Sequence, residues 1–183
     1  MKMSAKRVVL LMGLVLLLDA NLVWAAPPND NATAAVTIDV AQIMEWLADF
    51  TAIDLPDITT QTSSSTGSGT ATLYTNGDVS ITANNTAAAQ LKLGTDPNQT
   101  LVTSYKLTDD GGADDAGGTG GTDEGSYTVH SLFLKDSAAY DIIHAAGDGA
   151  VVIELHVEAK NEDGDVADVG TYGATQTLTA AWG

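Results

Sequence analysis

The feature that most constrains the fold is the segment Val151–Glu158, in which large apolar residues recur at every second position. Successive side chains of a β-strand point to opposite faces, so this spacing places all the recurring residues on one face. The set consists of Val151, Ile153, Leu155 and Val157. The segment therefore predicts a half-buried strand of an antiparallel sheet.

Much of the remaining chain repeats this pattern in shorter pieces separated by polar turns. Thr171–Trp182 alternates similarly, with Gln176 as the one polar residue on its apolar face. We count about eight to ten such segments, a number and spacing typical of all-β sandwiches. The sequence predicts an all-β fold: a single antiparallel β-sandwich, Ig-like or jelly-roll-like, spanning residues 36–183.

Two local patterns refine this prediction. Asn76-Gly77 lies between the strand candidates Thr70–Tyr74 and Val79–Ala83 and indicates a hairpin with a type I′ turn. Apolar residues at helical spacing predict one short helix near the N-terminus, over 41–50, and the alternative is an irregular strand. The residues at helical spacing are Val40, Ile43, Met44, Leu47 and Phe50.

The first 25 residues have the organisation of a secretory signal peptide. Lys2, Lys6 and Arg7 precede the apolar run Val8–Leu18, and Val23-Trp24-Ala25 supplies small residues at the cleavage site. The run is shorter than the roughly 20 residues that span a bilayer. We therefore predict cleavage after Ala25, a secreted, cell-surface or periplasmic protein, a flexible leader over 26–35 and no membrane insertion after cleavage. An uncleaved N-terminal anchor is the alternative.

Charge and composition exclude several functions. Residues 1–25 carry three of the seven basic residues and one of the twenty-four acidic ones, so their removal changes the net charge from −17 to −19. A chain this acidic has no basic patch for nucleic acid. It contains no cysteine, which excludes thiol catalysis, iron–sulfur clusters and cysteine–zinc sites.

Two acidic segments are the candidates for mobile or metal-binding loops. Residues 109–125 contain no apolar residue larger than alanine and predict a mobile acidic, glycine-rich loop. The second segment groups four oxygen ligands of the kind that Ca²⁺ takes: Asn161, Asp163, Asp165 and Asp168. Ca²⁺ at this second loop is the one cofactor that the sequence suggests, and Asp163-Gly164 is equally typical of an ordinary turn.

The segment 34–40 is a candidate for strand exchange between molecules. Val36, Ile38 and Val40 alternate with Thr37 and Asp39, immediately after the leader. An extended segment of this kind can add to an open sheet edge of a neighbour, with main-chain hydrogen bonds giving affinity and alternate side chains filling pockets. Val36, Ile38 and Val40 are thus the predicted strand-donation interface, and pairing within the same chain is the alternative.

No catalytic constellation is evident, and we predict that the protein is not an enzyme. His156 lies between Glu154 and Glu158 on the polar face of its predicted strand, where a cross-strand polar role explains it. No nucleophile elbow, zinc-protease motif or phosphate loop occurs. For carbohydrate binding, the tyrosines not assigned to a core are the candidate platforms: Tyr74, Tyr105 and Tyr140.

Four stretches together carry a resemblance to a class of known proteins. They are Val-Thr-Ile-Asp-Val (36–40), Leu-Pro-Asp-Ile-Thr (55–59), Tyr-Thr-Asn-Gly-Asp-Val-Ser-Ile (74–81) and Gly-Thr-Tyr-Gly-Ala-Thr-Gln-Thr-Leu-Thr (170–179). In this order, after a signal peptide, they resemble secreted bacterial surface sandwiches, including fimbrial and biofilm-matrix fibre subunits. The resemblance implies a sandwich fold and fibre formation, although the cysteine pair of chaperone–usher pilins is missing.

The leading hypothesis is an exported, non-enzymatic structural subunit of a surface fibre or extracellular matrix that self-associates through 34–40. The alternative is a secreted calcium- or carbohydrate-binding module.

Overall fold

The structure is a computed structural model, which describes residues 32–110, 126–135, 139–144 and 149–183. The predicted signal peptide and residues 111–125 of the predicted acidic loop lie outside the described residues. The chain divides into two units, Met1–Asp39 and Val40–Gly183. In the first unit, residues 32–39 have no regular secondary structure.

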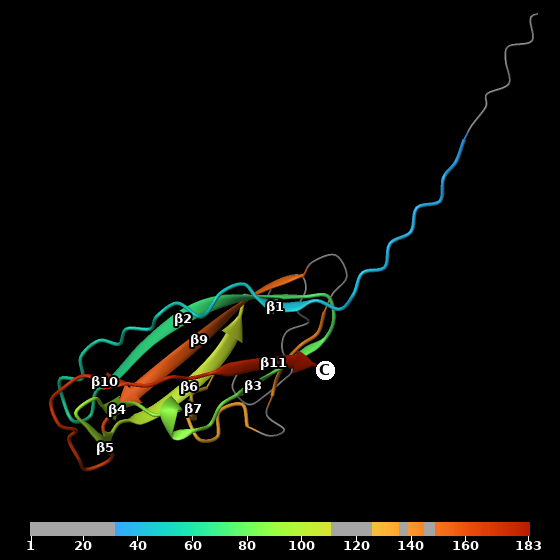
Figure 1. The fold of residues 1–183 in the computed structure, drawn as a ribbon. Coiled ribbons are helices and arrows are strands. Elements are labelled where there is room, and N and C mark those ends of the chain that lie inside the picture. Colours follow the sequence, from blue (N-terminus) through green and yellow to red (C-terminus); the bar gives the residue numbers. More distant parts are fainter. Residues whose placement is uncertain (1–31, 111–125, 136–138, 145–148) are drawn as a thin grey trace, which may run out of the picture. The chain divides into compact units, whose positions relative to one another are not determined.

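The second unit is an antiparallel β-sandwich, which confirms the predicted fold class. Its larger layer is a five-stranded sheet in the order β1-β2-β9-β6-β7, and Figure 1 shows its long strands running side by side. These strands are β1 (Met44–Trp46), β2 (Ser64–Thr75), β9 (Ala150–Lys160), β6 (Val102–Asp109) and β7 (Thr128–Val129).

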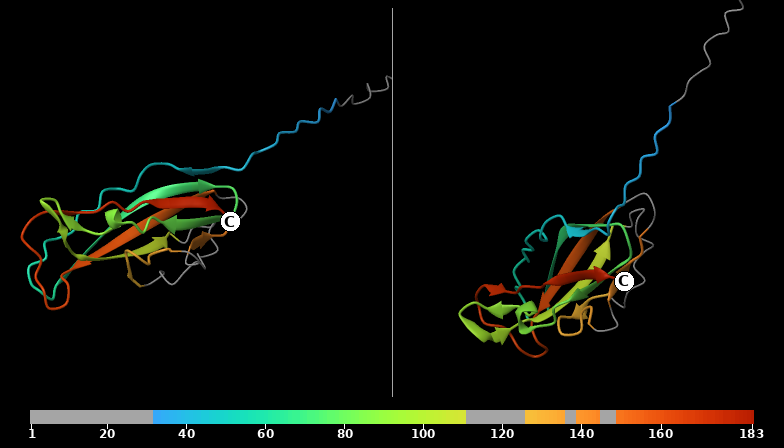
Figure 2. Two further views of the ribbon diagram at one scale, coloured as in Figure 1. Left: turned by 60° about the horizontal axis from the view of Figure 1, so that its bottom comes forward. Right: turned by 45° about the vertical axis from the view of Figure 1, so that its right-hand side comes forward.

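Two three-stranded sheets, in the orders β11-β3-β8 and β10-β4-β5, contribute the remaining strands. Both are visible in the two views of Figure 2. Their strands are β3 (Val79–Ala83), β4 (Lys92–Leu93), β5 (Asp96–Thr100), β8 (Tyr140–Ile142), β10 (Tyr172–Gly173) and β11 (Leu178–Trp182). A 3₁₀ turn, η2 (Ala87–Ala89), is the one helical element of the described residues. No helix in the described part of the chain is long and apolar enough to cross a membrane.

The strand predicted from period-2 spacing is β9, at the centre of the large sheet. It pairs with β2 on one side and with β6 on the other. Its four alternating apolar residues all point into the core and are at most 7% exposed. They pack against a single main cluster that includes Leu73, Ile81, Leu107 and Phe133. The alternation thus placed one face of β9 in the core, as predicted.

The helix predicted over 41–50 is wrong. Residues 44–46 form β1, which pairs with the end of β2 so that Met44 lies opposite Thr75 and Trp46 opposite Leu73. Ile43 and Leu47, which the helical spacing placed on the buried stripe, are 47% and 63% exposed. Pairing with the free edge of β2 provides backbone hydrogen bonds that outweigh the local helical spacing.

The hairpin predicted at Asn76-Gly77 is also wrong. β2 belongs to the large sheet and β3 to a small one, so the strands on either side of the turn do not pair with each other. Positive φ occurs among the described glycines at Gly164 and Gly170, so Gly77 lacks the backbone conformation of a type I′ turn. The Asn76 side chain instead accepts from the Ile43 amide at 2.8 Å and donates to the Ala41 carbonyl at 2.9 Å.

Candidate functional site

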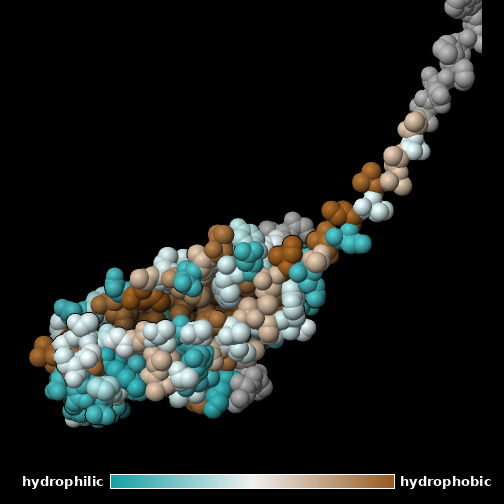
Figure 3. All heavy atoms as spheres, in the orientation of Figure 1, coloured by the Kyte–Doolittle hydropathy of each residue, from teal (hydrophilic) through white to brown (hydrophobic). Residues whose placement is uncertain are grey.

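One side of the sandwich, between residues 44–58 and residues 172–182, is hollowed at residues 50–61 and 166–176. We call it the open seam. Half-buried apolar side chains from both segments pack on the main core along this side. From the first segment they are Met44, Trp46, Phe50, Ile53 and Leu55, and from the second Leu178, Ala180 and Trp182. In Figure 3, apolar side chains are exposed over this part of the domain.

The first wall of the open seam lies unusually close to the large sheet because β2 carries glycines there. A Cβ at Gly69 would lie 2.4 Å from the Thr51 carbonyl oxygen, and one at Gly67 would lie 3.0 Å from a Leu55 methyl. The absence of side chains at these two positions lets Ile53 and Leu55 rest on the inner face of β2.

Two hollows open along the seam. The smaller has a volume of about 330 Å³ and lies between Phe50, Ile53 and Leu55 on one side and residues 172–176 on the other, with Tyr105, Leu155 and Val157 also lining it. Tyr105 is 2% exposed, its hydroxyl donates to the Ala89 carbonyl at 2.6 Å, and burial raises its pKa to about 12. The hollow thus combines apolar side chains with the polar side chains of Thr175 and Gln176.

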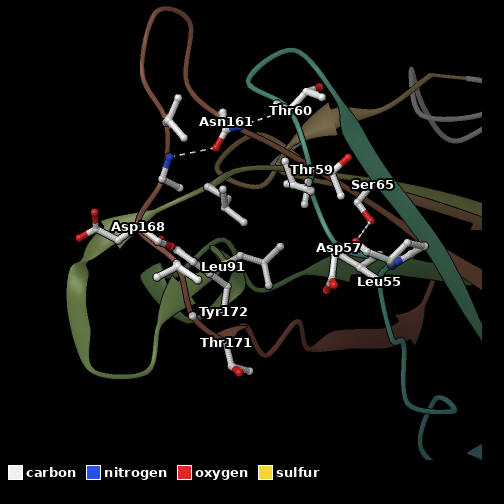
Figure 4. Close-up of a pocket in the computed structure, with 18 of the residues that line it drawn as sticks. Leu55, Asp57, Thr59, Thr60, Ser65, Leu91, Asn161, Asp168, Thr171 and Tyr172 are labelled. Atoms are coloured by element: carbon white, nitrogen blue, oxygen red, sulfur yellow. Dashed lines mark hydrogen bonds between the residues drawn. The ribbon is translucent and has the colours of Figure 1, made fainter.

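The larger hollow, of about 660 Å³, adjoins the smaller one and shares Leu55, Leu91 and Tyr172 with it. Figure 4 shows its labelled residues coming from the 55–65 segment, from Leu91 and from residues 161–172. Buried Leu91, Leu101 and Ala159 form a small core cluster beneath it. Asp57 and Asp168 are its two acidic lining residues. Burial, followed by the nearby Asp168 and Asp96 carboxylates, raises the pKa of Tyr172.

Two of the four predicted calcium ligands, Asn161 and Asp165, make side-chain hydrogen bonds within their loop. Asn161 is 7% exposed; its side-chain oxygen accepts from the Ala167 amide at 3.0 Å, and its nitrogen donates to the carbonyls of Thr60 and Gln61, each at 3.3 Å. Asp165 accepts from the Val166 amide at 2.7 Å, and Asp163 is exposed in the turn at Gly164. Asp168 is exposed and accepts from the Tyr172 hydroxyl through its main-chain carbonyl, at 3.0 Å.

Within the described ranges, no three His, Asp or Glu side chains gather into a group that could hold a metal ion. Calcium binding by the 161–168 loop stays a prediction, because Ca²⁺ also takes backbone and amide oxygens and a loop can rearrange around an ion.

Of the three tyrosines considered as carbohydrate platforms, two are buried in the core. Tyr105 is 2% and Tyr140 0% exposed, whereas Tyr74 is 40% exposed. Alternation in β6 and β8 places the first two on inner faces, a burial that isolated tyrosines in a sequence do not reveal. The structure therefore overturns Tyr105 and Tyr140 as platforms.

His156 lies on the outer face of β9, opposite the residues that enter the core. Its Nε2 is 2.9 Å from the Thr108 hydroxyl of β6 and 3.7 Å from a Glu154 carboxylate oxygen. Desolvation lowers its pKa; Glu154 opposes this shift, and Lys106 adds to it. Neither hollow of the open seam includes His156 among its lining residues.

The three predicted strand-donation residues are exposed, with Val36 at 90%, Ile38 at 86% and Val40 at 71% of their surface accessible. The open seam itself was not predicted. Two features of the sequence hinted at it. Ile53 and Leu55 alternate in a segment too short to be predicted as a strand, and Gln176 interrupts the apolar face of the last predicted strand.

Comparison with protein-family models and with curated proteins gives no match for this chain. A function for this chain is therefore proposed from its residues and their geometry.

Proposed function

We propose that this protein is an exported, non-enzymatic structural subunit that assembles into a surface fibre or extracellular matrix by donating the segment 34–40 to a neighbouring copy. The observation that carries the proposal is the exposure of Val36, Ile38 and Val40 in a stretch without regular secondary structure. Three large β-branched side chains at alternate positions form one apolar face when the stretch becomes a strand.

The energetic argument compares exposed and buried states. Fully burying a Val or Ile side chain contributes roughly 1.5–3 kcal/mol, so three of them favour association by several kcal/mol before the cost of ordering the segment. Main-chain hydrogen bonds to a sheet edge add to this. The high negative charge opposes nonspecific aggregation and leaves the directed contact as the favourable one.

The test compares the chain beginning at Ala26 with a chain beginning at Ala41, by negative-stain electron microscopy and analytical ultracentrifugation. The shorter chain keeps the Ala41 carbonyl that Asn76 binds, so its fold loses no described hydrogen bond to Asn76. We expect fibres or long oligomers from the longer chain and monomers from the shorter one. Monomers from both chains at high concentration would refute the proposal.

A matched pair of variants tests whether assembly depends on the apolar side chains of the segment 34–40 or only on the presence of the segment. Val36→Ser, Ile38→Ser and Val40→Ser together should abolish assembly, because they remove the alternating apolar side chains. Thr37→Ser and Asp39→Ser together change the opposite face of the same stretch and should leave assembly intact.

The second candidate, a secreted calcium- or carbohydrate-binding module, draws on the loop 161–168 and the hollow beside it. It predicts a saturable rise in melting temperature with Ca²⁺ or with a sugar, because a ligand that binds the folded state stabilises it. The variant Asp163→Asn with Asp165→Asn should remove the calcium effect. No rise at millimolar Ca²⁺ would dismiss the calcium form of this function.

A further inference from the structure

We infer that the open seam is the acceptor site for the segment 34–40 of a second copy of this chain, which pairs with the unpaired edge of residues 172–182. This inference rests on the proposed function and specifies its receiving surface. The donor was recognised from its alternation, whereas the acceptor follows from the sheet order and from the contacts inside the seam.

The first observation is an unpaired main-chain edge. β11 is the terminal strand of its sheet and pairs with β3; β10 is the terminal strand of its own and pairs with β4. Between them, the Thr175 amide donates to Ala88 at 2.7 Å and the Thr177 carbonyl accepts from Asn84 at 2.8 Å. Residues 172–182 thus use one side of their backbone for pairing, and no described strand pairs with the other side.

The alternation of hydrogen bonds fixes which groups face the seam. Thr175 and Thr177 direct their main-chain groups toward the 84–88 segment. Main-chain groups of successive strand residues point to opposite sides, so Gln176 and the even-numbered residues of β11 direct theirs away from that segment. These residues are Gln176, Leu178, Ala180 and Trp182. The edge therefore presents donors and acceptors at a regular two-residue spacing, as an added strand requires.

The second observation is a buried polar atom that lacks a partner. The Gln176 Nε2 donates to the carbonyls of Asn84 and Thr177, at 3.2 and 2.9 Å. Its Oε1 is buried and has no hydrogen-bond partner among the described residues, although Gln176 lines the smaller hollow. Leaving such an atom unpaired costs about 1–3 kcal/mol. An amide of an incoming strand would satisfy it.

The opposite wall of the seam is an irregular segment. Thr51 donates its amide to the Thr70 carbonyl at 3.1 Å, which keeps the start of this wall on β2. Residues 52–58 then contain no strand and line the gap with Ile53 and Leu55. An apolar alternating strand matches these walls better than a charged ligand does, because buried charge without a partner is costly.

The apolar residues of the donor repeat at the two-residue spacing of a strand edge. Val36 and Val40 are four residues apart, about 13 Å in a strand at roughly 3.3 Å per residue. Gln176 and Ala180 have the same separation along the acceptor edge, and Ala180 offers little side-chain bulk opposite a large residue. Asp39 is the one charged residue of the donor.

A second copy is the favoured occupant because of how this chain enters its own domain. Three residues, Ala41 to Ile43, separate Val40 from β1, and Asn76 binds the first and the last of them. The donor of the same chain would have to reverse its direction within this bound stretch. Donation between copies needs no reversal, and because donor and acceptor are different surfaces, repetition builds an open filament.

The test uses the absence of cysteine from the sequence. One batch of the chain beginning at Ala26 carries Ile38→Cys, and a second, size-tagged batch carries Ala180→Cys or Gln176→Cys at the acceptor edge. The control batch carries Thr179→Cys, whose side chain is exposed on the other face of β11. The batches are mixed, oxidised mildly and analysed by mass and by electron microscopy.

We expect a mixed disulfide between the two sizes with Ala180→Cys or Gln176→Cys, on the order of tenfold above the Thr179→Cys control, because docking raises the effective concentration of the thiols. Fibres with no such excess at either seam position would overturn this inference and leave the proposed function standing. Absence of fibres and of any oligomer would overturn both. A disulfide that forms within one chain when Ile38→Cys and Ala180→Cys are combined, and not between chains, would also overturn the inference.

Discussion

The two long sides of the sandwich are closed to different degrees. Around β7 and β8, the side chains of Phe133, Leu134, Tyr140 and Ile142 are all 0% exposed. Along the open seam, the apolar side chains of both walls are only half buried. The side chains that are fully covered contribute stability, and those that are partly covered retain apolar surface that another chain can bury.

The largest expected difference between the two sides concerns phenylalanine truncation. Phe133→Ala, on the closed side, should lower the free energy of unfolding by about 3–5 kcal/mol. Phe50→Ala, in the open seam, should lower it by about 1–2 kcal/mol, because part of its surface is already in water. Urea unfolding followed by tryptophan fluorescence measures both. Equal losses would mean that the two sides are equally packed.

The second prediction concerns the close approach of the seam wall to β2. Gly69→Ala places a methyl group 2.4 Å from the Thr51 carbonyl oxygen. The backbone must shift to accommodate it, so we expect a loss of about 1–3 kcal/mol in unfolding free energy.

Gly173→Ala is the matched control on the other wall, because its added Cβ would meet nothing within 4 Å. It should change stability by no more than about 0.5 kcal/mol. If both alanine variants unfold at the same urea concentration, residues 51–55 do not lie against β2 as described.

The third prediction concerns the point where the chain enters the domain. Asn76→Ala removes the bonds to the Ile43 amide and the Ala41 carbonyl. We expect a loss of about 1 kcal/mol and faster amide exchange at Ile43, measured by NMR. Asn98→Ala, which removes a local bond to Asp96, should leave exchange at Ile43 unchanged.

The smallest effect concerns His156, on the outer face and therefore outside the comparison of the two sides. Its pKa is lower in the folded state, so the unfolded chain binds a proton first as the pH falls below the ordinary value of about 6.5. The contribution of His156 to stability is then complete above that pH and decreases below it. His156→Gln should flatten the decrease in melting temperature on acidification; an unchanged slope would contradict the shift.

The sequence predicted the fold correctly where apolar residues alternate regularly and one face of the strand is buried. Alternation in β9 was sufficient to place one face of the central strand in the core. The spacing at 41–50 was misleading because residues 44–46 find the edge of β2, a partner distant in sequence. Asn76-Gly77 was misread because a turn signal does not state whether its two strands share a sheet.

The candidate site was less predictable for the same reason. The exposed alternation of 36–40 is a local property and was evident from sequence. The open seam depends on which strands end each sheet and on Gly67 and Gly69 lying opposite residues 51–55, and both are tertiary facts. The predicted calcium ligands were selected by composition, which does not reveal that Asn161 closes its own loop.

The bonds between Asn76 and residues 41 and 43 also have a mechanical consequence. Tension applied to the chain before Val40 reaches the domain at this asparagine and at the three residue pairs of β1 and β2. Ladder hydrogen bonds are perpendicular to their strands, so a pull along the strand axis loads them together in shear. The entry point of the chain is therefore built to resist stretching along β1 more than peeling away from β2.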